Sequence, residues 1–239
     1  MVGATPEMLE KYLPDGTFPN AVNAFLVKTP ERTILVDAGF GRRLFDNLKA
    51  LNVSPEQVDV ILLTHMHGDH IGGLLRDGKK AFPRAGFYIS KVEHDYWMNS
   101  GSEAQKAVIN AYKDRLHLFD AQEPGDASAD LIPGVKAFAA YGHTPGHAVF
   151  MFRSGNERLL VWGDLTHAMK IQMPCPGVAV TYDTDPVQAV ASRKKILEYV
   201  SGNGIPVAGM HIAYPGIGKV KPGGENGYVW APVEDNQSK

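Results

Sequence analysis

Four side chains that can bind a metal ion lie within six residues of one another, directly after an apolar run at 58–63. They are His65, His67, Asp69 and His70. The apolar run is broken only by Asp59 and is typical of a buried strand, and Gly72 and Gly73 allow a tight turn after it. Imidazole nitrogens and carboxylate oxygens are common ligands of zinc and similar ions. The segment therefore predicts a metal site at the end of a strand.

The spacing of these residues divides them between two ions. His65 and His67 are two positions apart, so in an extended segment their side chains point to the same side and can share one ion. Asp69 and His70 follow the bend and point elsewhere, toward a second ion. The alternative is a surface loop that is merely rich in histidine, and it is disfavoured because such a dense pattern rarely arises without a metal.

Further candidate ligands follow other expected strands. Strands are predicted at 33–36, 135–140, 158–161 and 206–209, and each runs into a metal-binding side chain. In chain order these are Asp37, then His143 or His147, then Asp164, then His211. Ligand sites on sheet scaffolds are built at strand ends. We therefore expect these residues to belong to the same site.

Strands and helices alternate along the chain without an interdomain linker. Further strands are expected at 22–27, 86–90 and 148–152, and helices at 6–13, 43–51, 91–98, 102–118 and 187–200. The Gly- and Pro-rich stretch from Pro215 is expected to be an irregular tail. This alternation predicts one domain over 1–239, with 1–20 and 232–239 peripheral.

Composition excludes several classes of function. The chain has 239 residues, 44% hydrophobic and 21% charged, with a net charge of −2, which is ordinary for a globular protein. No basic patch suggests a nucleic-acid partner, and no apolar run reaches the ~18 residues that a membrane span needs. The start resembles no signal peptide, so we expect a cytoplasmic protein. The single cysteine, Cys175, excludes an internal disulfide and is interpreted as structural.

These motifs resemble those of the metallo-β-lactamase superfamily over about 20–220. Residues 65–70 fit its His-x-His-x-Asp-His signature, and the Gly-His-Thr-Pro-Gly-His stretch at 142–147 is similar to its third motif, whose first histidine is the ligand. Asp164 and His211 stand where the fourth and last motifs have ligands. Segments 23–27, 163–167 and 211–216 most resemble the branch that holds methyl parathion hydrolase, close to the N-acyl-homoserine lactonases.

The resemblance implies a four-layer αββα sandwich of two mixed β-sheets with helices outside. It also implies two divalent metal ions, zinc first, with manganese, iron or cobalt accepted by the same ligand types. One ion is assigned to His65, His67 and His143, the other to Asp69, His70 and His211, and Asp164 bridges both. The implied protein is a hydrolase whose metal-bridging hydroxide cleaves a small ester, lactone or phosphotriester.

Some residues carry two interpretations. Asp69 is a ligand and could also orient the nucleophile. His167 stands three residues after Asp164, where lactonases of the superfamily carry a tyrosine, and it either donates a hydrogen bond to the substrate or does not reach it. Asp37 and Thr64 either orient ligand imidazoles or cap turns.

Other candidates are interpreted as structural. His147 is expected to be a core histidine bonded to backbone, and His94 and His117 are expected to face solvent on helices. The Asp183–Asp185 run is expected mostly to cap a helix, with Asp183 alternatively reaching the rim of the site. Five further side chains could line a substrate wall or simply pack in the core: Phe18, Trp97, Met169, Ile171 and Met173, with Tyr182 as a sixth.

Two other functions stay open. One is a mononuclear iron enzyme of oxygen or sulfur chemistry on the same fold; a diiron version is disfavoured because His67 stands where those relatives carry glutamate. The other is a non-catalytic metal-bearing binding or carrier protein. The expected partner is a small-molecule substrate. A homodimer is also open, because residues 1–20 look too short to supply the family's first edge strand and a second copy could cover that edge.

Overall fold

The structure is a computed structural model that describes residues 1–224 and 227–234; residues 235–239 of the predicted peripheral tail lie outside the described residues. Internal packing divides the chain into two compact units. We call Val22–Ala121 the amino unit, and Met1–Ala21 together with Gln122–Lys239 the carboxyl unit. Each unit has its own mixed sheet and its own apolar core.

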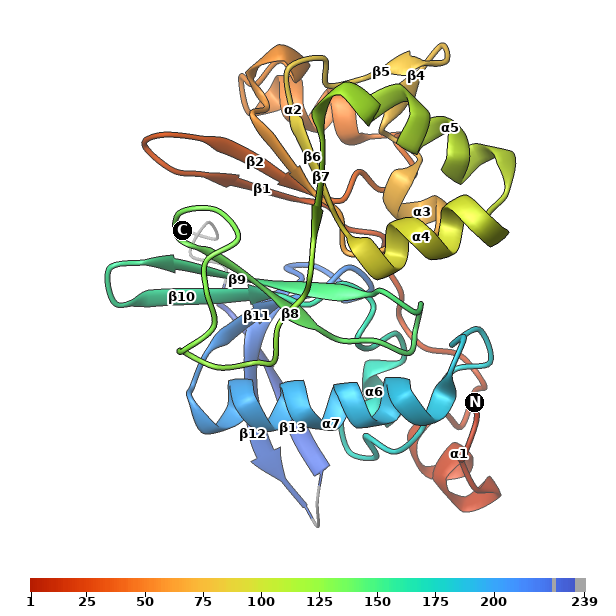
Figure 1. Cartoon of the computed structure of the whole chain (residues 1–239). Coiled ribbons are helices and arrows are strands. Elements are labelled where there is room, and N and C mark those ends of the chain that lie inside the picture. Colours follow the sequence, from red (N-terminus) through yellow and green to blue (C-terminus); the bar gives the residue numbers. More distant parts are fainter. Residues whose placement is uncertain (225–226, 235–239) are drawn as a thin grey trace. The chain divides into compact units, whose positions relative to one another are not determined.

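A five-stranded sheet forms the frame of the amino unit (Figure 1). Its strands, in spatial order, are β1 (Phe25–Lys28), β2 (Thr33–Val36), β3 (Val60–Leu62), β6 (Gly86–Ser90) and β7 (Leu116–Phe119). β1 is antiparallel to β2, and every other neighbouring pair is parallel. The carboxyl ends of β2, β3 and β6 therefore meet at one edge of this sheet.

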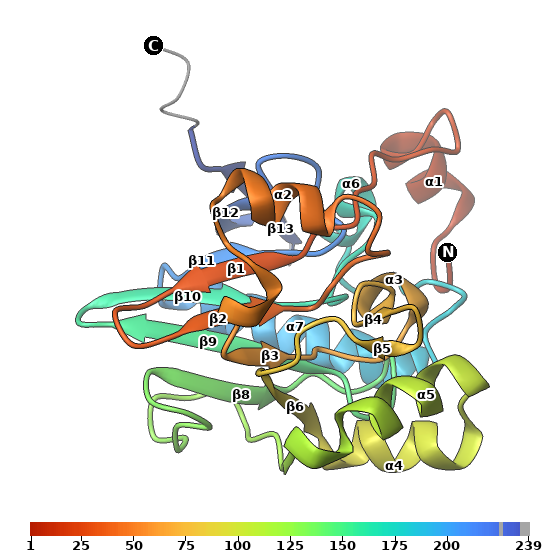
Figure 2. The same cartoon turned by 90° about the horizontal axis from the view of Figure 1, so that it is seen from above.

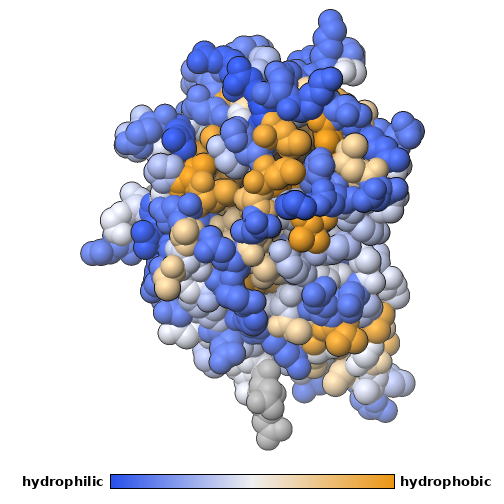
Figure 3. Space-filling model, in the orientation of Figure 1, coloured by the Kyte–Doolittle hydropathy of each residue, from blue (hydrophilic) through white to orange (hydrophobic). Residues whose placement is uncertain are grey.

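The helices of the amino unit are short. They are α2 (Leu44–Ala50), α3 (Gly68–Ile71), α4 (Lys91–Ser100), α5 (Glu103–Tyr112) and the 3₁₀ turns η1 (Pro55–Gln57) and η2 (Lys113–Arg115). A small hairpin joins β4 (Leu75–Arg76) to β5 (Lys79–Lys80). Figure 2 shows α4 and α5 side by side. In Figure 3 the larger of two apolar patches on the visible face lies over this unit, among hydrophilic neighbours.

Large buried side chains hold the amino unit together. Ile61 and Phe87 of the sheet pack with Ile109 and Tyr112 of α5, all at most 3% exposed. Each such side chain contributes roughly 1.5–3 kcal/mol on burial, which more than offsets the poor intrinsic stability of short helices. The strand ends on which the metal motif stands are thus anchored in a rigid core.

A six-stranded sheet forms the frame of the carboxyl unit. Its strands, in spatial order, are β13 (Gly227–Pro232), β12 (Ile217–Gly223), β11 (Pro206–Ala208), β10 (Glu157–Val161), β9 (Ala148–Ser154) and β8 (Val135–Ala139). β10 and β11 are parallel, and the other neighbouring pairs are antiparallel. β8, β10 and β11 consequently run in the same direction, so their carboxyl ends share one edge.

Within its described residues, the carboxyl unit also has helices α1 (Pro6–Tyr12), α6 (Met169–Gln172) and α7 (Pro186–Gly202). α7 begins where the Asp185 carboxylate accepts hydrogen bonds from the next free backbone N–H groups, with Pro186 at its first position. Its residues Ile196 and Leu197 are fully buried in the apolar core of this unit. Figure 1 shows α7 running along one face of the sheet of this unit. None of the helices over the described ranges has the length and hydrophobicity that crossing a bilayer requires.

The two mixed sheets of the predicted fold class are confirmed, and two local predictions are wrong. The helix expected over 102–118 ends at Tyr112, because the polar residues 113–115 form a 3₁₀ turn and the chain then pairs with β6 as strand β7. The expected irregular tail from Pro215 instead forms β12 and β13. Gly218 and Val220 are buried there while Lys219 and Lys221 are exposed, a period-two pattern that glycine and proline content obscured.

Candidate metal centre

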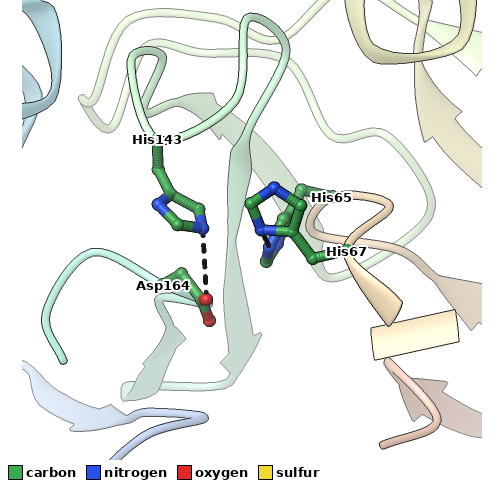
Figure 4. A group of neighbouring side chains, drawn as sticks. All are labelled: His65, His67, His143 and Asp164. Carbon is green, nitrogen blue, oxygen red and sulfur yellow. Dashed lines mark hydrogen bonds and ion pairs between the residues drawn. The ribbon is translucent and has the colours of Figure 1, made fainter. Parts of the chain in front are cut away.

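The His65–His70 motif occupies the loop and short helix that follow β3 in the amino unit. The hydroxyl of Thr64 donates to Asp37 at 2.7 Å, so the same oxygen accepts from Nδ1–H of His65 at 3.1 Å. The other nitrogen of His65, Nε2, thereby presents its lone pair 3.1 Å from Nδ1 of His67 (Figure 4). This separation is close to the ~3.3 Å between two nitrogen ligands of one tetrahedral ion.

Asp37 orients the second half of the motif. Its Oδ2 lies 2.6 Å from Nδ1 of His70, and its Oδ1 accepts the backbone N–H of Thr64 at 2.8 Å. The backbone of Asp37 has a positive φ of 56°, which is uncommon for a residue other than glycine. The contacts of Asp37 and Thr64 with two imidazoles agree with the orienting interpretation of these residues.

The glycines after the motif serve a close approach rather than a left-handed turn. A Cβ at Gly73 would lie 2.5 Å from the carbonyl oxygen of Ala38, and one at Gly72 2.8 Å from Cα of Phe40. The N–H of Ala38 donates to the carbonyl of His70 at 2.8 Å. Only glycine lets these two loops touch, and their contact fixes Asp37 against His70.

Glu93 is a supporting residue of the amino unit that sequence reasoning missed. It is fully buried at the start of α4, and its Oε1 accepts from the N–H of Met66 at 2.9 Å and from Nε1–H of Trp97 at 2.5 Å. Trp97 in turn meets the ring of His67 edge-on, with centroids 5.8 Å apart. A glutamate in a helical first turn looks like ordinary capping, so the sequence carries no signal for this role.

Imidazole nitrogens surround one carboxylate oxygen in the carboxyl unit. Asp164 Oδ2 lies 2.9 Å from Nε2 of His211, 3.0 Å from Nε2 of His167 and 3.3 Å from Nε2 of His143 (Figure 4 shows the last pair). All four side chains are at most 4% exposed. Donor atoms of Asp164, His167 and His211 form a group with metal-binding spacing. This convergence is the arrangement expected around a bridging carboxylate.

Each predicted histidine ligand of the carboxyl unit is oriented through its other nitrogen. Nδ1 of His143 lies 2.8 Å from Asp183, and Nδ1 of His211 lies 2.8 Å from the carbonyl of Ala21 and 3.0 Å from Oδ1 of Asn20. With a proton on each Nδ1, Nε2 carries the lone pair that a metal needs. The capping interpretation holds for Asp185, whereas Asp183 follows the alternative more nearly, because its side chain turns inward to His143.

The remaining histidines divide as follows. His147 donates from Nδ1 to the carbonyl of Ala140 and accepts the N–H of Asp164 at Nε2, both at 3.0 Å, so its prediction as a backbone-bonded core histidine is confirmed. His94 is half-buried and pairs with Asp95, so its solvent-facing prediction is wrong. His117 is exposed as predicted, but it lies on β7 rather than on a helix.

The apolar candidates are mainly core residues. Ile171 and Met173 are at most 2% exposed and belong to apolar clusters of the carboxyl unit, and Met169 and Phe18 pack against the same clusters. Tyr182 differs, because it is 50% exposed and meets the ring of His167 edge-on at 4.9 Å. Of this group, it is therefore the residue of the carboxyl unit best placed to meet a ligand.

Burial and neighbouring carboxylates pull the histidine pKa values apart. Desolvation alone would lower the pKa of His143, but Asp164 and Asp183 outweigh it and raise this pKa to about 9. Burial lowers the pKa of His167 to about 4, against the attraction of Asp164. His167 is therefore a neutral imidazole at pH 7, whereas His143 of the metal-free protein carries a proton.

Metal binding is therefore expected to release a proton. A metal ion on Nε2 of His143 displaces the proton that its pKa of about 9 retains at pH 7, so about one proton leaves on binding and affinity rises as pH increases toward 9. Zinc titration by calorimetry at pH 7 in two buffers of different ionisation enthalpy measures this release. Equal heats in both buffers would contradict the expectation.

The donor chemistry of both units fits divalent metal ions. The predicted ligands are five imidazoles and two carboxylates, and four of the imidazoles have one nitrogen held by an oxygen, from Thr64, Asp37, Asp183 or the 20–21 segment. Such oriented imidazoles are typical of zinc sites and of related transition metals.

Comparison with known proteins gives the family. The profile of the metallo-β-lactamase superfamily matches residues 17–201. The chain belongs to the metallo-β-lactamase superfamily. The predicted class, a superfamily hydrolase on this fold, is thereby confirmed at the level of the family.

Among solved structures, the chain is similar to AidC, described as a dizinc quorum-quenching lactonase. The two are 30% identical, with a TM-score of 0.86 over 97% of this chain and 87% of that one. It is also similar to AbOPH, a hydrolase of the β-lactamase superfamily, at 30% identity and a TM-score of 0.85 over 98% and 89% of the two chains.

A curated relative is also named as a lactonase. The N-acyl homoserine lactonase AttM of Agrobacterium fabrum is 26% identical over 130 residues, which cover 48% of this chain and 44% of AttM. The matches to curated relatives span between a fifth and three fifths of those proteins' lengths. Their names indicate hydrolytic chemistry for parts of the family rather than one shared substrate.

Proposed function

We propose that this chain is a dinuclear metal-dependent hydrolase of small lactones and esters. In this proposal the groups of the two units hold the ions together: His65, His67 and His143 hold one, Asp69, His70 and His211 hold the other, and Asp164 contacts both. Zinc is the proposed metal, because the ligands are mostly imidazole and a similar lactonase is described as dizinc.

One observation carries the proposal above the others. Oδ2 of Asp164 has three imidazole Nε2 atoms within 3.3 Å, in a setting where burial would otherwise make such a cluster costly. Two of these imidazoles, those of His143 and His211, belong to different proposed ions, so their approach to one carboxylate oxygen favours a metal-bridging role for Asp164.

Bound as a pair, such ions supply an activated water and a Lewis acid for the substrate oxygen. The chain's own residues then orient and transfer protons. The Asp69 side chain is 21% exposed, which leaves its carboxylate able to orient a nucleophilic water and accept its proton. Neutral His167 has a single N–H, which faces Oδ2 of Asp164 at 3.0 Å in the metal-free protein; in this proposal that N–H serves the carbonyl or phosphoryl oxygen of the substrate, in the place of the lactonase tyrosine, when Asp164 is engaged by metal.

The proposed substrate class rests on the names of similar proteins. Lactones are placed first because AidC and AttM carry lactonase names, with aryl esters and phosphotriesters next. The proposed partner is thus a small molecule. A cytoplasmic location, a homodimer and a single domain over 1–239 stay predictions.

A hydrolysis panel with metal analysis tests the function. Zinc-loaded protein is assayed on N-acyl-homoserine lactones, γ- and δ-lactones, aryl esters, phosphotriesters, thioesters and β-lactams, and the metal content of the same sample is measured. We expect about two metal ions per chain and turnover of at least one lactone or ester. A fully loaded protein that turns over nothing in the panel favours the carrier interpretation, and iron alone at one ion per chain favours the mononuclear alternative.

His167→Phe separates two roles of that residue. Phenylalanine keeps the ring but has no N–H, so kcat is expected to fall about 10–100-fold while both metal ions stay bound. His117→Phe, on exposed β7, is the matched control and should leave kcat unchanged. If His167→Phe instead loses one metal ion, then His167 is a ligand rather than a hydrogen-bond donor to the substrate.

A further inference from the structure

A fully buried arginine contacts the segment that follows Asp164 in the carboxyl unit. We call Asp164 and the three histidines around it, His143, His167 and His211, the metal group of this unit. Arg193 of α7 is 1% exposed, and no other arginine in the described ranges is buried. Its Nε donates to the carbonyl of Leu165 at 2.7 Å, and its Nη1 donates to the carbonyls of Pro176 at 3.1 Å and Val178 at 2.8 Å. One guanidinium thus ties three points of the segment 165–178 to α7.

The same guanidinium reaches the carboxylate that orients His143. Nη2 of Arg193 lies 3.9 Å from Oδ2 of Asp183. That oxygen also accepts the N–H of Val180 at 3.1 Å, while Oδ1 of Asp183 faces Nδ1 of His143 at 2.8 Å. Arg193 is therefore linked to the metal group on two routes, through Leu165, which follows Asp164, and through Asp183.

A second buried side chain supports the first route. Gln172 is fully buried, and its Oε1 accepts the N–H groups of His167 at 2.7 Å and Ala168 at 2.9 Å. Its Nε2 donates to the carbonyl of Val178 at 3.1 Å, the same oxygen that Arg193 holds. The segment between Asp164 and Asp183 is thereby held by buried side chains in addition to its one short helix, α6.

Stability alone does not explain this charge. Taking a guanidinium out of water costs several kcal/mol, and a well-packed apolar side chain of similar volume often serves a core equally well. What an apolar residue lacks is the planar fork of donors that fixes several oxygens at once. The geometry of the segment, rather than burial, is what Arg193 supplies.

We propose that Arg193 is a positioning residue that sets the coordination geometry of the metal centre by fixing the backbone next to Asp164 and the carboxylate that orients His143. This inference rests on the proposed metal centre. It predicts that loss of the guanidinium fork weakens metal binding at a distance, with no ligand removed.

Three variants of the full chain test the proposal. Arg193→Met removes the charge and the fork, and Arg193→Lys keeps the charge but cannot hold three carbonyls. Lys136→Met is the matched control: Lys136 is a second buried cation of the carboxyl unit, 4% exposed, bonded to the carbonyls of Asp126 and Ser128 but to no predicted ligand or residue that orients one. The readouts are zinc affinity by chelator competition, the visible spectrum of the Co²⁺ form and thermal unfolding of the metal-free protein.

We expect zinc affinity to fall about 10–100-fold in Arg193→Met, less in Arg193→Lys, and not in Lys136→Met. The Co²⁺ spectrum should change only in the Arg193 variants. Wild-type affinity and spectrum in Arg193→Lys, which is the variant that keeps the fold most safely, would overturn the proposal. A wild type that binds no zinc would instead contradict the proposed function, so the two failures are told apart.

Discussion

Replacing Asp164 with alanine is expected to abolish hydrolysis, lowering kcat/KM by at least about a thousandfold. Oδ2 of Asp164 is the point on which three imidazoles converge, and its backbone N–H is held by His147. Removing the carboxylate takes a shared ligand from both proposed ions and leaves buried imidazoles facing one another.

Metal analysis and kinetics on one preparation measure this effect. The metal content of Asp164→Ala should fall from about two ions per chain to one or fewer. Asp114→Asn is the control, because Asp114 is 58% exposed and pairs with Lys80 at the surface of the amino unit. Its activity and metal content should match the wild type. If Asp164→Ala still binds two ions and has the wild-type kcat/KM, Asp164 does not bridge the ions.

Chelation is expected to remove activity completely and to lower the melting temperature by the order of 10 °C. A ligand at about 100 times its Kd stabilises the folded state by ~2.7 kcal/mol, and each kcal/mol shifts the melting point of a chain of this size by about 2–4 °C. Two such ions therefore account for the expected shift. In the metal-free protein the buried imidazoles keep their orientation but lack the stabilising bonds to metal ions.

Readdition separates metal loss from damage. Protein treated with a chelator and then dialysed should regain activity and melting temperature with Zn²⁺, and in part with Mn²⁺ or Co²⁺, but not with Mg²⁺, since imidazole-rich sites disfavour it. The measurement is differential scanning calorimetry with activity assayed on the same samples. A chelated protein of unchanged melting temperature and activity would show that no resident metal matters.

The ligand candidates were predictable because their signals are local. His65, His67, Asp69 and His70 lie together in sequence. Asp164 and His211 each follow an apolar run that predicts a strand. Apolar runs also identified most strands of the two sheets, but not β7, which follows the polar turn 113–115, nor β12 and β13, whose glycine and proline residues obscure the pattern. That the ligand groups of the two units bind one pair of ions stays part of the proposal.

The supporting residues were not predictable for a physical reason. Asp183, Glu93 and Arg193 act through contacts with residues about 15 to 40 positions away, and each sits in a setting that has an ordinary local explanation. A carboxylate near a helix start looks like a cap whether it turns outward or inward. Only the packing of α7 and α4 decides the direction.

The hydrogen bonds of Asn20 and Ala21 with His211 affect when the protein can fold during its synthesis. These acceptors precede His211 by 191 and 190 positions, yet they belong to the same unit. On the ribosome they emerge early and stay without their partner until nearly the whole described chain has followed. Contacts of such long sequence separation form slowly, because a large loop must close first. The carboxyl unit thus consists of two chain segments that flank the amino unit in sequence. Its ligand residues can therefore reach their final positions only late in folding.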